Sequence, residues 1–283
     1  MSGTSPTVQR RRLGLELRRL RERAGKTLDE VARVLRCSQS KVSRIESGQV
    51  APTPGDVLSL LDLYAVDTEQ RERLMHAVRQ ARKRNWWQAY GDTSVVPLVG
   101  LEAEAERIRQ YAAMAIPGLL QTRSYAQAII SALRPDLPAD QLQRRVDLRM
   151  ERQQVLRQDD RPRYLVVLEE CVVRRPVGGR SAMREQLRQL VEAAALPNVI
   201  LQIAPLAIGA HAGMSGAFII CQFADPDPDV VYLEEYLDYP TGDLYLEGEA
   251  QVRQYASAFE RIWASALSPD RSTALLTALA NEL

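Results

Sequence analysis

Side chains that bind metals or form disulfides are scarce in this sequence of 283 residues, which has three cysteines and two histidines. Cys37, Cys171 and Cys221 lie far apart and form no Cys-x-x-Cys pair, and His76 and His211 are equally distant from each other. A disulfide framework or a zinc site requires ligands at characteristic short spacings. We therefore expect free thiols in a reducing cytoplasm, no metal site and no cofactor.

Long apolar runs are missing too. No stretch approaches the roughly 18 consecutive apolar residues of a membrane-spanning helix. The arginine cluster near the amino terminus is not followed by the apolar segment that a signal peptide requires. Hydrophobic residues make up 46% and charged residues 26% of the chain, a composition typical of globular proteins. We expect a cytoplasmic protein that does not bind a membrane.

Patterns typical of enzymes are missing as well, since no glycine-rich phosphate loop follows a predicted strand. His211 could act as a base for Ser215 or Cys221, but no acid partner or nucleophile elbow accompanies it. Glu169 and Glu170 could resemble a pair of catalytic carboxylates, but adjacent residues of a strand point to opposite faces. We therefore expect a protein without enzyme activity and a loop position for His211.

Charge, by contrast, is abundant and unevenly distributed. Residues 1–90 hold 18 Lys and Arg against 10 Asp and Glu, a net charge of +8, whereas residues 91–283 have a net charge of −7. A basic end on an otherwise acidic chain indicates that this end meets a polyanion and that the rest does not. Charged runs are often only solvated surface, so the bias supports a nucleic-acid partner without establishing one.

The first ninety residues predict consecutive short helices. Apolar residues at helical spacing mark the first, which ends near Gly25. Thr27 and Ser38 are suited to cap the starts of the second and the third. Pro54 opens the fourth, because proline is favoured at the first helical position. The fifth begins near Thr68 and runs through the basic stretch RQARKRNWW.

The third of these helices, residues 38–48, is too polar to be a core helix. Only Val42 and Ile45 are apolar, so one face packs against a neighbour and the other stays exposed. Two helices joined by a tight turn, the second polar at its start, are typical of a helix-turn-helix. Side chains near that start can bond to base edges in the major groove of DNA. These side chains are Gln39, Ser40 and Lys41.

Residues 13–66 resemble the XRE-like family of phage-repressor-type helix-turn-helix proteins, through the core S-x-S-x-V-S-R-I-E-x-G-x-x-x-P at residues 38–52. The DNA-binding residues that the resemblance implies are Thr27, Ser38, Gln39, Ser40, Lys41, Ser43 and Arg44. By this resemblance, the residues at the positions where family members read bases are Gln39, Ser40 and Arg44. Lys41 and Ser43 fall near phosphates, and Thr27 sits at the end that meets the backbone. The resemblance also implies a structural pair that fixes the first helix onto the third, formed by Arg21 and Glu46.

Beyond residue 90 the helical period is interrupted, and we place a linker at residues 91–100. Helices are expected near residues 100–115, 122–133, 138–158, 181–195, 247–266 and 269–283. Short β-branched runs bounded by Pro, Gly and Asp predict strands at RYLVVLEEC, VILQIAP, AFIICQF and VVYLEEY. The expected fold class is multidomain, with an all-α helix-turn-helix domain at residues 1–90 and an α+β regulatory and dimerisation domain at residues 101–283.

Residues 101–283 resemble a body that recurs after helix-turn-helix domains in actinobacterial regulators. The match covers almost the whole segment, and PGLLQT followed by YA is its most telling piece. Such proteins are described as antitoxin-like transcriptional regulators and are often encoded beside a small partner protein. The resemblance implies a body that receives a signal through either a small-molecule effector or a protein.

Together these features favour a sequence-specific DNA-binding transcriptional regulator whose partner is double-stranded DNA. One helix-turn-helix domain contacts only a few base pairs, so we expect a homodimer on a two-fold symmetric operator. Three alternatives stay open. They are an antitoxin-like protein that sequesters a small partner and autoregulates its promoter, an enzyme with a DNA-binding appendage, and a helical bundle whose third helix is merely solvated.

Overall fold

The structure is a computed structural model of the chain, and it describes residues 6–48, 50–81, 96–158, 161–224, 229–233, 244–246 and 248–283. The chain divides into two compact units, an amino-terminal one that ends at Glu104 and a carboxy-terminal one from Ala105 to Leu283. An all-α unit is followed by an α+β unit, as the sequence predicts. None of the helices in the described ranges combines the length and the apolar character needed to span a membrane.

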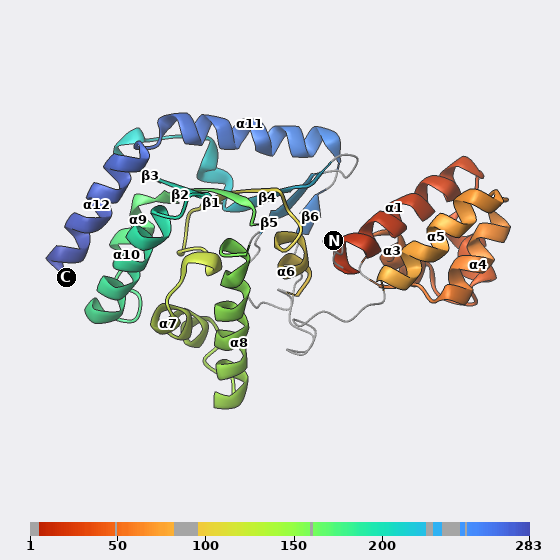
Figure 1. Cartoon of the computed structure of the whole chain (residues 1–283), viewed down its shortest axis with the longest axis horizontal. Helices are drawn as coiled ribbons and strands as arrows, with labels where there is room; N and C mark the ends of the chain where they lie inside the picture. Colours follow the sequence, from red (N-terminus) through yellow and green to blue (C-terminus); the bar gives the residue numbers. More distant parts are fainter. Residues whose placement is uncertain are drawn as a thin grey trace. The chain divides into compact units, whose positions relative to one another are not determined.

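The amino-terminal unit is built from short helices around an apolar core (Figure 1). The helices are α1 (Pro6–Arg23), α2 (Leu28–Val34), α3 (Gln39–Glu46), α4 (Pro54–Leu63), α5 (Thr68–Ala81) and α6 (Val96–Glu102). The buried apolar side chains of α1 to α5 form a cluster that includes Leu17, Val31, Val42, Ile45 and Leu61. Burial of these side chains, rather than the propensity of such short helices, stabilises the unit.

Local sequence signals set the ends of these helices. The Thr27 hydroxyl accepts a hydrogen bond from the Glu30 N–H, and the Glu30 carboxylate accepts one from the Thr27 N–H. These two bonds form a capping box and confirm the predicted cap at Thr27. The Ser38 hydroxyl likewise accepts from the Lys41 N–H at the start of α3. Gly25, just past α1, adopts a φ of 66°, which glycine tolerates best.

A mixed sheet with the strand order β3-β2-β1-β4-β5-β6 organises the carboxy-terminal unit. The strands that run parallel are β1 (Arg107–Ala112), β2 (Arg163–Glu169) and β3 (Val199–Ala204). The strands that continue the sheet in antiparallel pairs are β4 (Phe218–Gln222), β5 (Val230–Leu233) and β6 (Leu244–Leu246). In this register Ile108 of β1 pairs with Tyr164 of β2 on one side and with Cys221 of β4 on the other.

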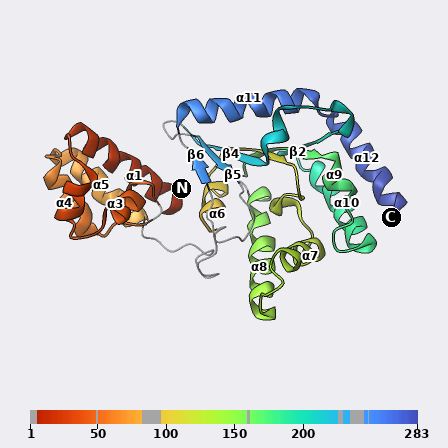
Figure 2. The same cartoon turned by 180° about the vertical axis from the view of Figure 1, so that it is seen from behind.

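Helices cover both faces of this sheet. The helices are α7 (Arg123–Leu133), α8 (Ala139–Arg152), α9 (Glu170–Arg174), α10 (Arg180–Ala194), α11 (Glu249–Ser265) and α12 (Pro269–Glu282). In Figure 1 and from behind in Figure 2, α11 runs along one face, while α7, α8 and α10 lie on the other side. Phe259 and Ile262 of α11 pack with Tyr111, Val167 and Phe218 of the sheet in one buried cluster.

The prediction of a helix near residues 100–115 is wrong. Residues 107–112 form β1, which lies between β2 and β4 in the sheet. The polar residues of RIRQYA conceal the strand, because Arg109 and Gln110 are buried, at 8% and 5% exposed. Gln110 accepts a hydrogen bond from the Tyr164 hydroxyl at 2.6 Å. Pairing and burial within the sheet override the local preference here.

Other boundaries differ by smaller amounts. The first predicted strand ends at Glu169, where α9 follows, and the helix expected at residues 138–158 ends at Arg152 and continues as a short 3-10 turn. The three-residue β6 was not predicted. α6 lies partly in the predicted linker, whose first half, residues 91–95, falls outside the described residues together with the end of the predicted fifth helix beyond Ala81.

Candidate nucleic-acid interface

α2 and α3 are joined by a short turn in which the Cys37 N–H donates to the Ala32 carbonyl at 2.9 Å. Arg36 takes a φ of 50°, a left-handed conformation that reverses the chain between the two helices. Val42 and Ile45 of α3 are both 1% exposed and form the face that packs on the core. The arrangement is a helix-turn-helix whose second helix has its opposite face available to a partner.

That opposite face carries the residues that the sequence assigns to DNA. Gln39, Ser40, Ser43 and Arg44 are exposed, and Lys41 is partly buried. Residues four apart share a helix face, and the Arg44 Nε donates to the Ser40 carbonyl at 3.3 Å. The structure therefore brings the predicted base-reading residues together on one exposed surface, which we call the α3 outer face.

Thr27 and Ser38, the other predicted contacts, both serve as helix caps. The Thr27 hydroxyl also donates to Oε2 of Glu30 at 3.0 Å, and the Ser38 hydroxyl accepts from the Lys41 N–H at 3.2 Å. Both residues are nevertheless exposed. Their hydroxyls hold helix ends in place, and their role beside the phosphate backbone stays a prediction.

Asp29 is a neighbour of this surface that sequence reasoning missed. The side-chain amide Nε2 of Gln39 donates a hydrogen bond to Oδ1 of Asp29, which lies in the first turn of α2. Both side chains are exposed. Side chains ten residues apart on one continuous helix would be too distant to touch. The turn between α2 and α3 brings these two side chains into contact.

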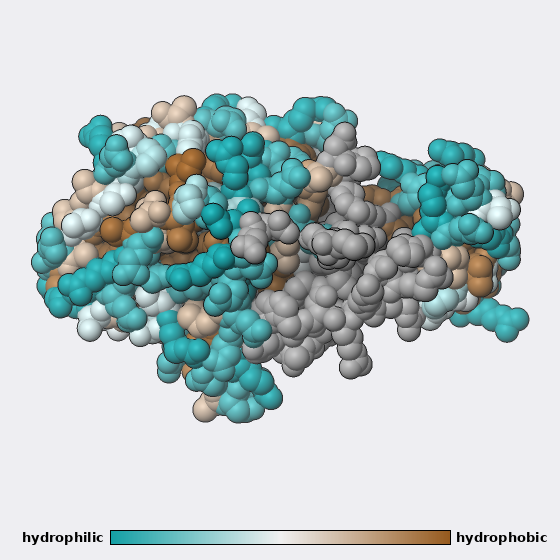
Figure 3. Space-filling view, viewed as in Figure 1, coloured by the Kyte–Doolittle hydropathy of each residue, from teal (hydrophilic) through white to brown (hydrophobic). Residues whose placement is uncertain are grey.

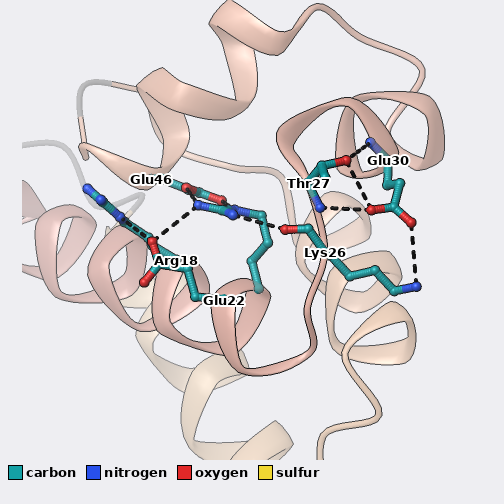
Figure 4. Close-up of polar contacts among 7 residues, drawn as sticks. Arg18, Glu22, Lys26, Thr27, Glu30 and Glu46 are labelled. Atoms are coloured by element: carbon teal, nitrogen blue, oxygen red, sulfur yellow. Dashed lines mark hydrogen bonds and ion pairs between the residues drawn. The ribbon is translucent and has the colours of Figure 1, made fainter.

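Arg21 and Glu46 tie the end of α1 to the end of α3. Figure 4 shows the polar contacts made by Glu46 and by the backbone of Lys26. Arg21 donates from Nε and from its second terminal nitrogen to the two carboxylate oxygens of Glu46, at 2.7 and 3.0 Å. Its third nitrogen donates to the Lys26 carbonyl at 3.0 Å. The hydrogen bond to Glu46 raises the pKa of Arg21, so the guanidinium stays charged. The predicted pair is thus a bidentate ion pair, a geometry that fixes the orientation of the two side chains as well as their distance.

α1 also approaches α3 closely at Gly14. A β-carbon at this position would lie 2.5 Å from the carbonyl oxygen of Ile45 and 2.6 Å from that of Glu46. Real β-carbons are essentially never so close to other atoms. Glycine is therefore required for α1 to rest against the carboxyl end of α3, and this contact fixes the angle at which the outer face is presented.

A second polar cluster lies where the parallel strands β1 and β2 end. The Tyr111 hydroxyl donates to Oε1 of Glu169 at 2.7 Å, and Nε2 of His211 lies 3.2 Å from the same oxygen. The Gly213 N–H donates to Nδ1 of His211 at 3.1 Å, so the ring proton is on Nε2 in the neutral form. Burial and the bond to Glu169 raise the pKa of Tyr111. His211 therefore has an acid partner, which sequence reasoning missed.

The neighbouring Glu170 serves different partners. Its carboxylate accepts from the Leu206 N–H at 2.9 Å and from Arg174 at 2.7 Å. The hydrogen bond from Leu206, followed by the contact with Arg174, lowers the pKa of Glu170 against the opposing effect of burial. Among the residues that the structure describes, no group of three or more His, Cys, Asp or Glu could hold a metal ion.

Exposed apolar side chains surround this end of the sheet. Met114 follows β1, Leu206 follows β3, and Met214 lies in the 3-10 turn that packs on Tyr111. They are 66%, 59% and 72% exposed. The face of this unit drawn in Figure 3 shows apolar surface in brown among the polar surface. In sheets with parallel strands, ligands bind outside the carboxyl ends of those strands.

The segment PGLLQT, residues 117–122, has a structural role. Gln121 donates to the Ile116 carbonyl at 2.6 Å, and Gln186 of α10 donates to the Leu120 carbonyl at 2.7 Å. Gln153 donates to the Gly118 carbonyl at 2.9 Å. These side chains satisfy backbone groups that burial would otherwise leave unpaired. The motif is therefore a buried junction between α7, the end of α8 and α10.

Family models match both parts of the chain. One, described as a helix-turn-helix domain, matches residues 12–74, which contain α2 and α3. Another, described as a domain of unknown function (DUF5753), matches residues 95–278, more than half of the chain. No curated protein and no solved structure matches. The first match agrees with the geometry of α2 and α3, and the amino-terminal unit is a helix-turn-helix DNA-binding domain.

Proposed function

The chain belongs to the family defined by the domain of unknown function DUF5753 and is a DNA-binding regulator, and we propose that it is an XRE-like, sequence-specific transcriptional regulator acting as a homodimer. The observation that carries this proposal is the α3 outer face. Its exposed Gln39, Ser40 and Arg44 are held in place by the buried face of the same helix. Amide, hydroxyl and guanidinium groups are the donors and acceptors that read base edges in the major groove.

Phosphate contacts supply most of the affinity in this proposal. Residues 1–90 have a net charge of +8, and Lys41 and Ser43 border the α3 outer face. Thr27 and Ser38 mark the helix ends that meet the DNA backbone. Such contacts position a protein on DNA without reading its sequence, whereas base contacts determine specificity.

A homodimer supplies the remaining specificity. One helix-turn-helix reads only a few base pairs, so two copies bound to half-sites about one helical turn apart are the usual solution. The acidic carboxy-terminal unit is the part that joins the copies, because its charge disfavours contact with DNA. The operator is therefore a two-fold symmetric sequence.

We further propose that the carboxy-terminal unit receives a signal by binding a ligand or a protein and does not catalyse a reaction. We also propose that the protein acts in the cytoplasm. Support comes from the end of the sheet where Tyr111, Glu169 and His211 lie together. A small-molecule effector bound there would meet the imidazole of His211 first, because His211 is partly exposed whereas Tyr111 and Glu169 are 1% and 8% exposed. Such a ligand would change the relative position of the two DNA-binding domains in the dimer. Binding of the ligand would thereby alter the affinity for DNA.

An antitoxin-like role is the second candidate. The exposed apolar side chains Met114, Leu206 and Met214 favour it, since apolar groups gathered on a surface mark sites of protein contact. In this role the unit sequesters a small protein while the DNA-binding domain represses the shared promoter. Purification of the chain from its native host distinguishes the two candidates, because a stoichiometric small protein is expected only in the second.

The proposed function is tested by selection from randomised double-stranded DNA with the full chain. Sequencing of the bound pool should show an enriched inverted repeat, with half-sites separated by about one helical turn, or 10 base pairs. Sedimentation of the chain on the enriched duplex should show two copies per duplex. A pool with no enriched sequence would contradict sequence-specific binding, and a single enriched half-site bound by one copy would contradict the dimer.

A further inference from the structure

The hydrogen bond between Gln39 and Asp29 adds a side chain of α2 to the surroundings of the α3 outer face. Gln39 is the first residue of α3, and Asp29 lies one residue into α2. The Gln39 Nε2 donates to Oδ1 of Asp29 across the turn. A residue outside the recognition helix therefore touches the side chain that is expected to read a base.

This hydrogen bond fixes which way the Gln39 amide points. A glutamine amide has two N–H donors on Nε2 and one acceptor oxygen, Oε1. Rotating the amide by half a turn would bring Oε1 against the Asp29 carboxylate, two groups that only accept hydrogen bonds. A hydrogen bond to an ionised carboxylate is also stronger than one between neutral groups. The remaining N–H and Oε1 are left as one donor and one acceptor.

A helix-stabilising role alone does not account for Asp29. Acidic residues favour the first turn of a helix, but Glu30 already occupies that turn of α2 and completes its capping box. A carboxylate beside DNA also repels phosphates and reduces the attraction that residues 1–90 provide. An acid at this place therefore weakens binding to DNA of any sequence, and its hydrogen bond with Gln39 is the contact through which it can affect discrimination between sequences.

We propose that Asp29 is a specificity-determining positioning residue, which orients the Gln39 amide to read adenine. Adenine presents the N7 acceptor next to the N6 amino donor in the major groove, and a glutamine with one N–H and Oε1 available bonds to both. Guanine presents two acceptors and cannot pair with Oε1. The inference rests on the proposed sequence-specific binding and adds the base that one residue selects.

The test uses full-length wild type and the variants Gln39→Ala, Asp29→Ala and Asp29→Asn, each in selection from the same randomised duplex pool. Gln39→Ala identifies the base pair read by Gln39 as the position where preference is lost. At that position wild type should prefer adenine by about tenfold or more. Asp29→Ala should reduce this preference to within about threefold and leave the other positions unchanged. Asp29→Asn keeps an acceptor oxygen for Nε2 but adds N–H donors that can bond to Oε1 when the Gln39 amide rotates, so it should show a preference between those of wild type and Asp29→Ala.

Both substitutions at Asp29 remove a negative charge, so both should bind scrambled duplex more tightly than wild type. This shared gain separates the effect of charge from the effect of positioning. The inference is overturned if Asp29→Ala keeps the adenine preference, if Asp29→Asn prefers adenine as strongly as wild type, or if Asp29→Ala weakens preference at all positions alike. A wild-type pool without any enriched sequence would instead overturn the proposed function, and this inference with it.

Discussion

At the scale of single residues, the pair Arg21–Glu46 is the contact whose loss should be most damaging. The two side chains are 12% and 8% exposed, and they form a bidentate ion pair. Removing one partner leaves the other charge buried without compensation, which costs about 3–5 kcal/mol. We expect Glu46→Ala to lower the melting temperature of the amino-terminal unit sharply, measured by thermal unfolding of the full chain.

The double substitution should cost less than the sum of the single ones, because neither charge is then stranded. Glu69→Ala is the matched control, since Glu69 forms an ion pair with Arg73 in which both side chains are mostly exposed. Such surface pairs contribute little. Strictly additive losses in the double-mutant cycle would show that the two residues do not act together.

Glu170 is the residue that should make the carboxy-terminal unit sensitive to acid. Its folded-state pKa lies below its ordinary value of 4.5, foremost because of the hydrogen bond from Leu206. The contribution of Glu170 to stability is therefore complete above pH 4.5 and is lost as the pH falls through the folded-state value. We expect Glu170→Gln to lower the melting temperature at pH 7, with a difference from wild type that narrows below pH 4.5.

The exposed Glu192 provides the comparison for this prediction. Glu192→Gln should follow the wild-type melting temperature at each pH. A difference between Glu170→Gln and wild type that stays constant from pH 7 to pH 3 would contradict the account of this carboxylate.

At the scale of helices, the packing of α1 on α3 depends on Gly14. Alanine favours a helix over glycine by about 1 kcal/mol. However, its β-carbon would lie 2.5 Å from the Ile45 carbonyl oxygen, and forcing atoms into a packed site costs about 1–3 kcal/mol. The cost of the steric clash should exceed the gain in helix propensity. We therefore expect Gly14→Ala to lower the melting temperature and to weaken binding to the selected duplex.

Gly55 of α4 has room for a β-carbon, which would lie 3.8 Å from the Thr53 hydroxyl oxygen, an ordinary van der Waals contact. Gly55→Ala should therefore leave the melting temperature unchanged or raise it. Equal effects of the two substitutions would mean that helix propensity, and not the approach of α1 to α3, determines the result.

Elements that depend on contacts between residues close in sequence could be predicted, and those that depend on contacts between distant residues could not. The caps at Thr27 and Ser38 depend on residues three positions away, so the sequence alone locates them. β1 was missed because its burial comes from β2 and β4, which are distant in sequence. The contacts of Gln39 with Asp29 and of His211 with Glu169 were missed for the same reason, since only the folded chain brings these pairs together.

At the scale of the whole molecule, charge separates DNA attraction from the rest of the chain. Residues 1–90 have a net charge of +8 and residues 91–283 one of −7. A fragment of residues 1–104, which contains the compact amino-terminal unit, should therefore bind DNA with a steep salt dependence. The expected slope is about −0.9 per phosphate contact on a double-logarithmic plot.

This fragment should be monomeric and should discriminate poorly between selected and scrambled duplexes, because nothing holds two copies in register. The full chain should show a similar slope per copy with better discrimination. Anisotropy titrations at several salt concentrations, with sedimentation of both proteins, measure these properties. Tight binding of DNA by residues 105–283 alone would contradict this division.

The most direct test of sequence reading by α3 is an anisotropy titration of the full chain with Arg44→Ala, on the selected duplex and on a scrambled one. Arg44 lies on the α3 outer face, so its loss should weaken binding to the selected duplex by roughly 1–3 kcal/mol and to the scrambled duplex by much less. Arg73→Ala removes the same charge from α5, where Arg73 is exposed, and should leave the ratio of the two affinities unchanged. Equal losses for Arg44→Ala on both duplexes would contradict base reading by α3.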